Sequence, residues 1–561
     1  MKKEYQTMKE MLEQIAANYK DKIAFIDIDE QDQLVEITYG KLKEDLDAFG
    51  TGMRALGLDQ NKIIILGRNR YHWALAYLTS AGTNGLTVPL DKELPDNEIQ
   101  NCINRVEADT IIYSGEFETR LKKMREQLCI KHYISMDQAS NLTIEKIIEV
   151  GKKELANGNR NYIDQPIDEN KVFELLFTSG TTSASKIVML TQKNIMSNVI
   201  EATKQIQIQK KDVLLSVLPL HHTLENTCGL IAPLTKGATI GYNDSFKNLS
   251  KNMKRIQPTI MIVVPRFLEL LNQKIERTIE KKQQTAKFEK TAKAATILRF
   301  PDQLKKRIFQ PIHQPIGGRL RFLFVGGAAS NPKNIRYMNQ LGIRVLEGYG
   351  LTECSPIVAL NTVKKVKIGS VGQVIPKTVV KIHQPDQDGV GEILVKGPGV
   401  FQGYYQNEEA TKFVMTKDGF FHTGDLGSFD KKHFLTIKGR TKNMILGSNG
   451  ENIYPEDLEF LLNQNSIIRE SLLHAENEGT KSVKLTAEIV LSEKIIEQIK
   501  KHPEYEEEIK EVIKKYIDEV NSQLPAYKRI SQFFLWTEEF QKNTTLKIQR
   551  QKVLEKKQKE K

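Results

Sequence analysis

Residues 173–190 read Phe-Glu-Leu-Leu-Phe-Thr-Ser-Gly-Thr-Thr-Ser-Ala-Ser-Lys-Ile-Val-Met-Leu. The apolar residues at both ends predict two strands, and the Ser, Thr and Gly residues between them predict a connecting loop. Backbone N–H groups and hydroxyls of such a loop can bind phosphate oxygens, and Lys186 can neutralise their charge. The stretch therefore indicates a phosphate-binding loop, but a solvated hairpin loop has the same composition. The Gly-x-x-x-x-Gly-Lys-Ser/Thr spacing of a P-loop is absent.

Short apolar runs alternate with longer amphipathic stretches on both sides of this loop. This alternation is typical of βα units around mainly parallel strands that are buried on both faces. The clearest runs are residues 63–66, 214–218, 260–264 and 322–325. We therefore expect an α/β fold, with a large N-terminal domain of βα-layered subdomains over residues 1–440.

The pattern of predicted strands and helices changes twice towards the C-terminus. From about residue 364 to 440, short strand-like segments are separated by Gly-containing turns, which predicts a smaller β-rich, barrel-like subdomain. Residues 441–561 contain a helical pattern from about Pro455, a strand-like segment at 483–490, and a charged helical stretch through Asn521. This last region is expected to form a small α+β domain.

Bulk composition restricts the class of protein. A chain of 561 residues exceeds what one core usually organises, and 40% apolar with 27% charged residues is typical of a globular protein. No apolar run approaches the ~20 residues that cross a bilayer, and no export signal is recognised. The four cysteines form no Cys-x-x-Cys pair, which favours reduced thiols. We expect a cytoplasmic protein.

Positive charge is concentrated in residues 274–307, which contain eleven Lys or Arg against four acids. The net charge of the whole chain is +12, which could favour anionic lipid, nucleic acid, or anionic small molecules such as nucleotides and coenzyme A. For this segment we expect a helical hairpin at an anionic membrane surface, on the inner face of the membrane. A solvated helical face explains the same pattern.

The loop from Thr178 to Lys186 resembles the signature loop of the adenylate-forming (AMP-binding) superfamily. This superfamily includes acyl-CoA synthetases, luciferases and the adenylation domains of peptide synthetases. Further segments resemble the superfamily's other motifs and follow in the same order, at residues 218–222, 326–328, 347–353, 423–425, 439–442 and 545–550. The resemblance spans residues 178–550 and implies ATP and coenzyme A as co-substrates, with Mg²⁺.

The resemblance also implies a set of nucleotide-binding residues. The phosphates of ATP would lie against Thr178, Ser179, Gly180, Thr181, Thr182 and Lys186. The base pocket would be lined by Gly326, Gly327 and Ala328, with Tyr349 stacked on the adenine beside Gly350. Asp425 would accept hydrogen bonds from the ribose hydroxyls, and Arg440 would support the ribose and the adjoining phosphate.

The catalytic residues implied by the resemblance act on the reacting groups. Attack of a carboxylate on the α-phosphorus of ATP brings anions together, so the site must supply cations and fixed donors rather than a protein nucleophile. Lys547 would bridge the carboxylate substrate and the α-phosphate, Glu353 would help to hold Mg²⁺, and Thr352 would lie beside the α-phosphate. His222 would close the acyl pocket, with His221 a packing or surface residue. Lys442 would be the hinge of a mobile C-terminal domain.

The phosphate loop departs from the usual superfamily pattern. Ser183, Ser185 and Ile187 occupy positions where the superfamily usually has Gly, Pro and Gly. The reaction class does not depend on these positions, but the reaction rate could.

Other segments resemble the long-chain fatty acyl-CoA synthetase branch. These are residues 263–267, the basic segment that follows, residues 317–329 and residues 544–548. A long-chain fatty acid is the substrate that this resemblance implies. A ligase that uses an acyl-carrier protein, or one for another carboxylic acid, would have the same nucleotide residues. A non-catalytic basic protein that binds nucleotides or membranes is disfavoured because Glu353, Asp425, Arg440 and Lys547 are all present, and we expect no nucleic-acid partner.

Overall fold

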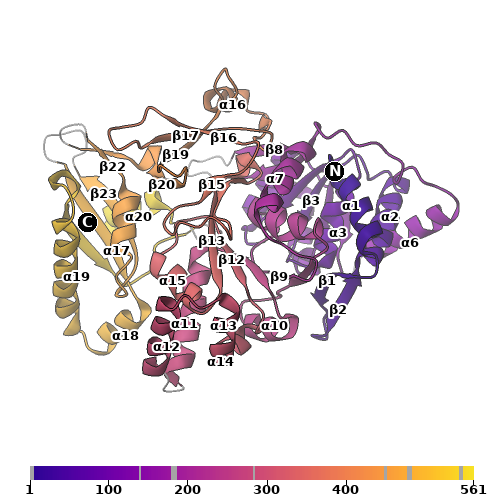
Figure 1. The fold of residues 1–561 in the computed structure, drawn as a ribbon. Coiled ribbons are helices and arrows are strands. Elements are labelled where there is room, and N and C mark those ends of the chain that lie inside the picture. Colours follow the sequence, from indigo (N-terminus) through magenta and orange to yellow (C-terminus); the bar gives the residue numbers. More distant parts are fainter. Residues whose placement is uncertain are drawn as a thin grey trace.

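The computed structural model describes residues 5–137, 141–178, 186–281, 285–447, 451–476, 483–542 and 548–560 (Figure 1). Several residues singled out in the sequence lie outside these ranges, namely Ser179, Gly180, Thr181, Thr182, Ser183, Ser185 and Lys547. Within the described ranges, no helix is both long enough and apolar enough to cross a membrane.

A seven-stranded sheet forms much of the N-terminal half, in the order β18-β8-β7-β4-β3-β5-β6. The β7-β4-β3-β5-β6 part is parallel, whereas β8 is antiparallel to both β7 and β18. The strands are β3 Lys62–Leu66, β4 Leu86–Leu90, β5 Thr110–Tyr113, β6 His132–Ser135, β7 Val172–Phe177, β8 Ile187–Thr191 and β18 Gly403–Tyr404. The predicted pair of strands around the phosphate loop is thus confirmed as β7 and β8.

A second sheet of nine strands has the order β15-β14-β13-β12-β11-β9-β10-β1-β2. Its central strands are parallel, and antiparallel strands complete both edges. The strands are β1 Ile23–Ile28, β2 Leu34–Thr38, β9 Val213–Ser216, β10 Thr239–Tyr242, β11 Ile260–Val263, β12 Phe322–Val325, β13 Arg344–Gly350, β14 Ile357–Leu360 and β15 Gln373–Val374. Parallel strands buried on both faces explain the continuous apolar runs of the sequence.

Helix α3 (Tyr71–Ser80) lies between the two sheets, because it contacts β1 of one sheet and β3 and β4 of the other. Nine of its ten residues are buried, as expected for a helix enclosed by protein. The other helices of this half are α1 Met8–Tyr19, α2 Tyr39–Ala55, α4 Asp96–Val106, α5 Glu118–Met124, α6 Ile144–Ala156, α7 Gln192–Gln205, α8 Thr223–Glu225, α9 Ala232–Leu234 and α10 Leu249–Ile256.

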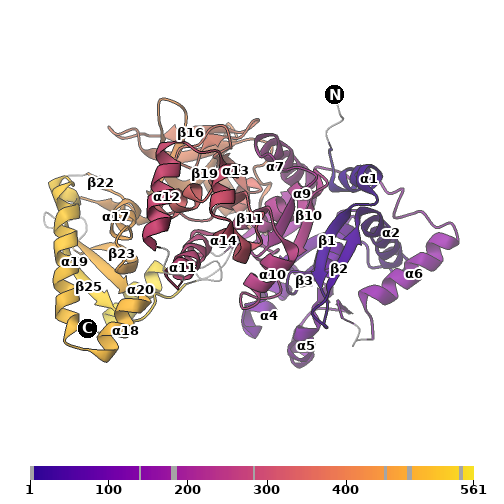
Figure 2. The same ribbon diagram turned by 60° about the horizontal axis from the view of Figure 1, so that its bottom comes forward.

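The basic segment folds as helices on the outside of the nine-stranded sheet (Figure 2). These are α11 Pro265–Lys281, α12 Thr285–Ile297, α13 Asp302–Ile308 and α14 Gln310–His313, and α15 Pro332–Gln340 lies against α11 and α12. Phe267, Leu271, Ile275 and Ile279 form the buried stripe of α11, so the helical spacing of its apolar residues explains how it packs.

Three smaller sheets follow among the described residues, and one of them has only two strands. An antiparallel sheet has the order β16-β17-β19-β20, with strands β16 Val379–His383, β17 Gly391–Lys396, β19 Phe421–Phe429 and β20 Leu435–Arg440; α16 Glu408–Val414 precedes β19. The C-terminal region has the sheet β23-β24-β25 with its own apolar core. Its elements are β21 Ile445–Leu446, β22 Asn452–Ile453, α17 Pro455–Leu462, β23 Ile468–Glu476, β24 Lys484–Leu491, α18 Glu493–Lys501, α19 Tyr505–Ser522, β25 Ile530–Trp536 and α20 Arg550–Glu560.

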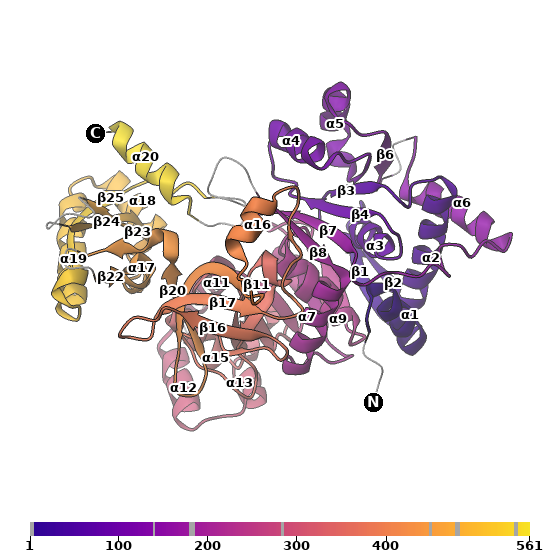
Figure 3. The ribbon, with the colours of Figure 1, turned by 90° about the horizontal axis from the view of Figure 1, so that it is seen from above.

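The C-terminal elements stand together on one side of the molecule, as seen in both Figure 1 and Figure 3. The predicted α/β fold class, with a layered N-terminal part and a small C-terminal α+β part, is confirmed. The boundary predicted between residues 440 and 441 falls where β20 ends and a 3₁₀ turn at Thr441–Asn443 begins.

Candidate active site

The cavity that contains the candidate residues has a volume of about 3170 Å³. Typical small-molecule pockets measure about 300–1,000 Å³, so this one has room for more than one substrate at a time. Its walls come from both sheets of the N-terminal half, from the β-rich subdomain, and from the C-terminal region. The cavity therefore lies where the parts of the chain meet.

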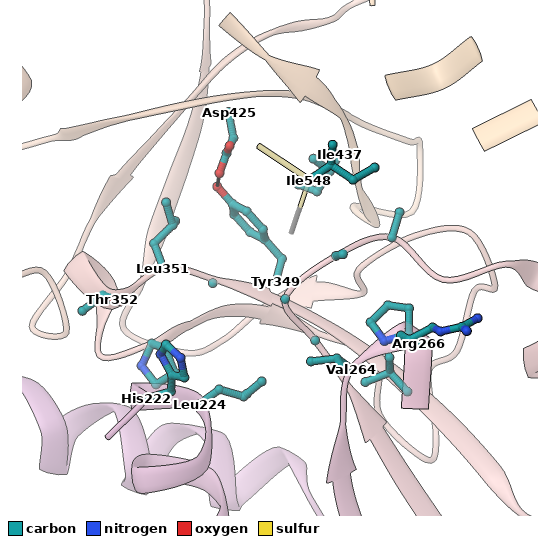
Figure 4. Close-up of a pocket in the computed structure, with 18 of the residues that line it drawn as sticks. His222, Leu224, Val264, Arg266, Tyr349, Leu351, Thr352, Asp425, Ile437 and Ile548 are labelled. Carbon is teal, nitrogen blue, oxygen red and sulfur yellow. Dashed lines mark hydrogen bonds between the residues drawn. The ribbon is translucent and has the colours of Figure 1, made fainter. Parts of the chain in front are cut away.

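Tyr349, Asp425 and Arg440 form a connected group on one wall of this cavity. Figure 4 shows Tyr349 pointing towards Asp425. Tyr349 Oη donates a 2.8 Å hydrogen bond to Asp425 Oδ2, and Arg440 Nε lies 3.1 Å from Asp425 Oδ1. Asp425 and Arg440 are direct partners across β19 and β20, so the pairing of these strands sets their distance. Burial raises the pKa of the Tyr349 hydroxyl well above its usual value, and the Asp425 charge adds to this. Tyr349 therefore remains a neutral donor to Asp425.

The glycines predicted for the base pocket follow strands of the nine-stranded sheet. Gly326, Gly327 and Ala328 come directly after β12, and all three line the cavity. Gly327 has a φ of +88°, a conformation that favours glycine. At Gly350, a Cβ atom would lie 1.9 Å from the Pro356 carbonyl oxygen, so only glycine fits there. The local backbone thus explains why positions 327 and 350 are glycine.

The two ends of the phosphate loop are held together. Thr178 N–H donates a 2.9 Å hydrogen bond to the Lys186 carbonyl oxygen, and its hydroxyl lies 3.2 Å from the same atom. Both residues line the cavity. The two residues that flank the predicted phosphate loop therefore lie together at the cavity wall.

Glu353 and Lys186 come together through an aromatic residue that the sequence did not indicate. Tyr404 Oη donates a 3.0 Å hydrogen bond to Glu353 Oε1, and Lys186 Nζ lies 4.6 Å from the centre of the Tyr404 ring. Burial raises the pKa of the Glu353 carboxyl, and the Lys186 charge opposes that shift. Thr352 precedes Glu353 in a 3₁₀ turn after β13, and it also lines the cavity.

The donor set around Glu353 fits magnesium only in part. The described residues contain no group of three or more His, Cys, Asp or Glu that could hold a metal ion. Mg²⁺ is usually bound by one or two carboxylates together with substrate phosphates, rather than by an all-protein cage. A single carboxylate beside Lys186 is compatible with that arrangement.

His222 and Leu224 line the cavity on the side opposite Asp425 (Figure 4). His222 caps the short helix α8, which begins at Thr223. The rings of His221 and His222 lie 4.3 Å apart, and His221 Nε2 is 3.7 Å from Asp91 Oδ2. Burial lowers the pKa of His221 well below its usual value, with His222 and Lys92 adding to the shift. His221 is therefore a neutral packing residue.

One part of the cavity is lined by apolar side chains from α7, the segment after it, and the nine-stranded sheet. These are Val199, Ala202, Ile206, Ile208, Leu214, Ile260, Ile262, Phe324 and Leu346. On β11, Ile260 and Ile262 both face the cavity, and so does Val264 beyond its end. Alternate residues of a strand point to one side, so this wall extends over four residue steps, roughly 13 Å.

The C-terminal wall of the cavity contains the neighbours of Lys547. Ile548 lines the cavity, and Arg550 begins α20. Arg550 Nη2 lies 2.5 Å from Glu459 Oε2, and Arg550 Nη1 donates a 2.9 Å hydrogen bond to the Leu473 carbonyl oxygen. Lys442 lies in the 3₁₀ turn after β20 and also lines the cavity. The predicted hinge and the segment next to Lys547 thus border the same space.

Sequence reasoning missed Tyr404, Glu459 and the function of Arg550 as an anchor. Tyr404 belongs to the two-residue strand β18, which pairs with β8. Glu459 lies on α17, in the middle of an ordinary amphipathic pattern. No local spacing connects these residues with their partners. Only the Tyr-Tyr pair at 404–405, directly after Gly403, marks the first of them as unusual.

The sequence matches known families over most of its length. Residues 12–405 match the family "AMP-binding enzyme", and residues 442–560 match "AMP-binding enzyme C-terminal domain". Similar curated proteins include the long-chain-fatty-acid–CoA ligase FadD15 of Mycobacterium bovis, 26% identical over 459 residues, covering 78% of this chain and 75% of the relative. Long-chain-fatty-acid–CoA ligase 1 of Cavia porcellus is 29% identical over 481 residues, covering 79% and 68%.

A third relative differs in its acceptor. It is the chloroplastic long-chain-fatty-acid–[acyl-carrier-protein] ligase AEE15 of Arabidopsis thaliana, 26% identical over 540 residues, covering 81% of this chain and 73% of the relative. Among solved structures, an anthranilate CoA ligase, AuaEII, with anthranoyl-AMP superposes with a TM-score of 0.76 at 18% identity, covering 99% of this chain and 98% of that one. ATP-bound MatB from Rhodopseudomonas palustris gives 0.75 at 20% identity, covering 98% and 99%. These structures share the fold.

Proposed function

This chain belongs to the AMP-binding enzyme family, and from that premise we propose that it is a long-chain fatty acid–CoA ligase. In the first step, a carboxylate oxygen attacks the α-phosphorus of ATP, and the bond to the β-phosphate oxygen breaks to release pyrophosphate. In the second step, the sulfur of coenzyme A attacks the acyl carbon of the acyl-AMP, and AMP leaves. The proton of the thiol passes to the surrounding water.

The observation that supports a long-chain acid is the apolar part of the cavity. A carboxylic acid whose head reaches the nucleotide wall needs an apolar surface for its chain, and burial of each CH₂ contributes about 0.8 kcal/mol. The wall along β11, from Ile260 to Val264, supplies such a surface next to the Gly326–Ala328 segment. A short acid would leave most of this wall without contact.

The residues around the nucleotide are proposed to act by position and charge. Asp425 would accept the ribose hydroxyls in addition to the Tyr349 hydroxyl, and the Tyr349 ring would stack on adenine. Lys186 and the loop that precedes it would bind phosphate oxygens. Lys547 would stabilise the charge that develops as the acid attacks, because a fixed cation in a site that excludes water is more effective than one in solvent.

Glu353 is the proposed ligand for Mg²⁺, which would neutralise the phosphates when bound. Thr352 would lie beside the α-phosphate, and His222 would close the acyl pocket after adenylation. Lys442 would be the pivot about which the C-terminal domain of residues 441–561 turns between the two steps. We propose a cytoplasmic location, with acids supplied from the membrane surface.

Pyrophosphate release with acids from C2 to C18, with and without coenzyme A, tests this function. We expect acid-dependent release that is highest for long chains, and acyl-CoA formation when coenzyme A is added. Adenylation with transfer to a carrier-protein phosphopantetheine, but not to coenzyme A, would favour the alternative of an acyl-carrier-protein ligase. Absence of acid-dependent pyrophosphate release across the panel would contradict both proposals and favour a non-catalytic binding protein.

A further inference from the structure

The corner between α12 and α13 exposes an unusual concentration of large apolar side chains. Ile297 and Leu298 are 68% and 64% exposed, and Leu304 and Ile308 are 40% and 38% exposed. Among the described residues, fourteen large apolar side chains are exposed, and these four lie within twelve consecutive positions. We name residues 290–308 the basic corner. Clustering of this kind marks an interaction surface rather than chance exposure.

The packing of α12 explains why the corner faces outwards. Ala292 and Ala295 are the buried side of this helix, which contacts α11 and α15. The helix ends at Ile297, and Arg299, with a φ of +51°, reverses the chain before α13. Neither α11 nor α15 covers the end of α12, where Ile297 and Leu298 are exposed. Leu304 and Ile308 are four residues apart and share one face of α13.

Exposed cations surround these apolar side chains. Lys290, Lys293, Arg299 and Arg307 are all exposed. The acid at the start of α13, Asp302, is held by Arg344, whose Nε lies 2.5 Å from Asp302 Oδ2. This carboxylate is therefore already paired with a cation from outside residues 290–308, so it does not offset the positive charge of the corner.

We propose that the basic corner docks the protein reversibly on an anionic lipid membrane. Lys and Arg next to a membrane are attracted by anionic headgroups, and neighbouring Ile and Leu side chains can enter the headgroup region. A nucleic acid would offer charge complementarity but no place for Ile297 and Leu298. The corner also lies one helix beyond the cavity, because α11 lines the cavity at Phe267 and Leu270.

This inference rests on the proposed function, since a long-chain acid partitions into membranes and would reach the cavity from there. Its test reads binding directly and so does not depend on activity. Sedimentation is measured with vesicles of phosphatidylcholine alone and of phosphatidylcholine with about 30% phosphatidylglycerol. We expect binding to the anionic vesicles only, and a strong decrease at high salt.

Charge substitutions test the assignment to the corner. The triple variant K293Q/R299Q/R307Q should bind anionic vesicles about 100-fold more weakly, at roughly fivefold for each cation removed. The matched control is K510Q/K514Q/K515Q, which removes the same charge from exposed positions of α19. We expect the control to bind within about threefold of the wild type, because those lysines lie on the C-terminal region.

Apolar substitutions separate insertion from simple charge attraction. I297S/L298S should weaken the binding that remains at high salt, whereas V366S/V379S, at 43% and 51% exposed positions of another surface, should not. All of these positions are exposed, so the variants should fold normally. Equal binding of the wild type to neutral and anionic vesicles, no binding to either, or equal losses in the corner and control variants would overturn the proposal.

An activity measurement distinguishes the two proposals. With detergent-dispersed palmitate, K293Q/R299Q/R307Q should form acyl-CoA at the wild-type rate, whereas palmitate supplied in anionic vesicles should be used several-fold more slowly. Loss of this difference would overturn the docking proposal alone. Absence of palmitate activation by the wild type under both conditions would overturn the proposed substrate and leave the vesicle-binding result to stand or fall by itself.

Discussion

Asp425 and Glu459 are both carboxylates paired with an arginine, but Asp425 belongs to the cavity wall, whereas Glu459 links elements of the C-terminal region. Of the two partners of Asp425, Arg440 lies on the adjacent strand β20 and Tyr349 lies on β13 of the nine-stranded sheet, and the group presents charge to the cavity. Glu459 lies on α17 and joins Arg550 of α20 to the Leu473 N–H of β23, at 2.6 Å. At the proposed nucleotide site, charge therefore faces the cavity where a ligand would bind. In the C-terminal region, the charge of Glu459 instead ties the start of α20, which follows Lys547 in the sequence, to β23.

The largest effect on activity is expected from substitution of Lys547 in the C-terminal region. Lys547→Ala removes a cation that we propose to act only while the acid attacks ATP, so acid-dependent ATP–pyrophosphate exchange should fall by about 10²–10³. Conversion of synthetic acyl-AMP and coenzyme A to thioester should remain near the wild-type rate. Lys542 is the nearest alternative, although it is already paired with Glu470 at 2.9 Å. Full exchange in K547A with loss in K542A would assign the charge to Lys542.

The proposed hinge at Lys442 offers a way to separate the adenylation step from thioester formation. Proline fixes φ near −65°, so Lys442→Pro should hold the C-terminal domain in one orientation. We expect most of the adenylation rate to remain and thioester formation to fall at least tenfold. Lys442→Ala, which keeps the backbone free, is the matched control and should preserve both steps. An equal loss of both half-reactions in K442P would place the hinge elsewhere.

Removal of the arginine should affect the stability of the C-terminal region. Burial raises the pKa of Glu459 to about 7, and Arg550 opposes that shift. Arg550→Ala leaves this buried carboxylate without its cation, which should cost about 3 kcal/mol at pH 8. The loss should be smaller at pH 5.5, because a carboxyl whose folded pKa is raised is protonated there. The double variant R550M/E459Q should recover most of the stability.

The positions of the two tryptophans allow the stability of the C-terminal region to be measured separately. Trp73 is buried in the N-terminal core, and Trp536 donates a 2.8 Å hydrogen bond to Glu488 in the C-terminal region. Urea unfolding followed by fluorescence in a W73F background therefore reports on the C-terminal region alone. An unchanged midpoint for R550A at both pH values would contradict the anchoring function of Glu459.

The parts of the fold with local patterns could be predicted from the sequence. The apolar run Phe322–Val325 coincides with β12, and the pattern from Pro455 coincides with the start of α17. The short strand-like segments separated by Gly-containing turns after residue 364 correspond to the β16-β17-β19-β20 sheet. In each of these segments, the residues that decide the structure are neighbours in the chain, so periodicity is sufficient.

Contacts between distant segments could not be predicted in this way. Tyr404 reaches Lys186 because the two-residue strand β18 pairs with β8, and so short a strand has no periodicity of its own. The pairing of Glu459 with Arg550 depends likewise on how α20 returns to α17. The site residues known only from motifs, including Lys547 and the predicted hinge Lys442, remain predictions of function. Long-range packing, rather than local propensity, decided each contact that the sequence did not indicate.

The smallest expected effect is on stability and concerns Glu225. This buried carboxyl group has no arginine partner among the described residues, unlike Asp425 and Glu459. Its Oε2 atom has no hydrogen-bond partner among the described residues, and burial raises its pKa to about 8. The native state therefore binds a proton more tightly than the unfolded chain does, and stability should fall as pH rises from about 4.5 towards 8. Glu225→Gln removes this titration.

Between pH 6.5 and 8, we expect wild-type stability to fall by up to about 2 kcal/mol relative to E225Q, at about 1.4 kcal/mol per pH unit. Urea unfolding in a W536F background, followed by Trp73, measures this difference in the N-terminal half, where Glu225 lies. Glu408→Gln is the control, since that side chain is 90% exposed and its substitution should give no pH-dependent difference. A constant difference between wild type and E225Q across this pH range would mean that Glu225 is already charged in the native state, with a compensating partner as effective as the arginines beside Asp425 and Glu459.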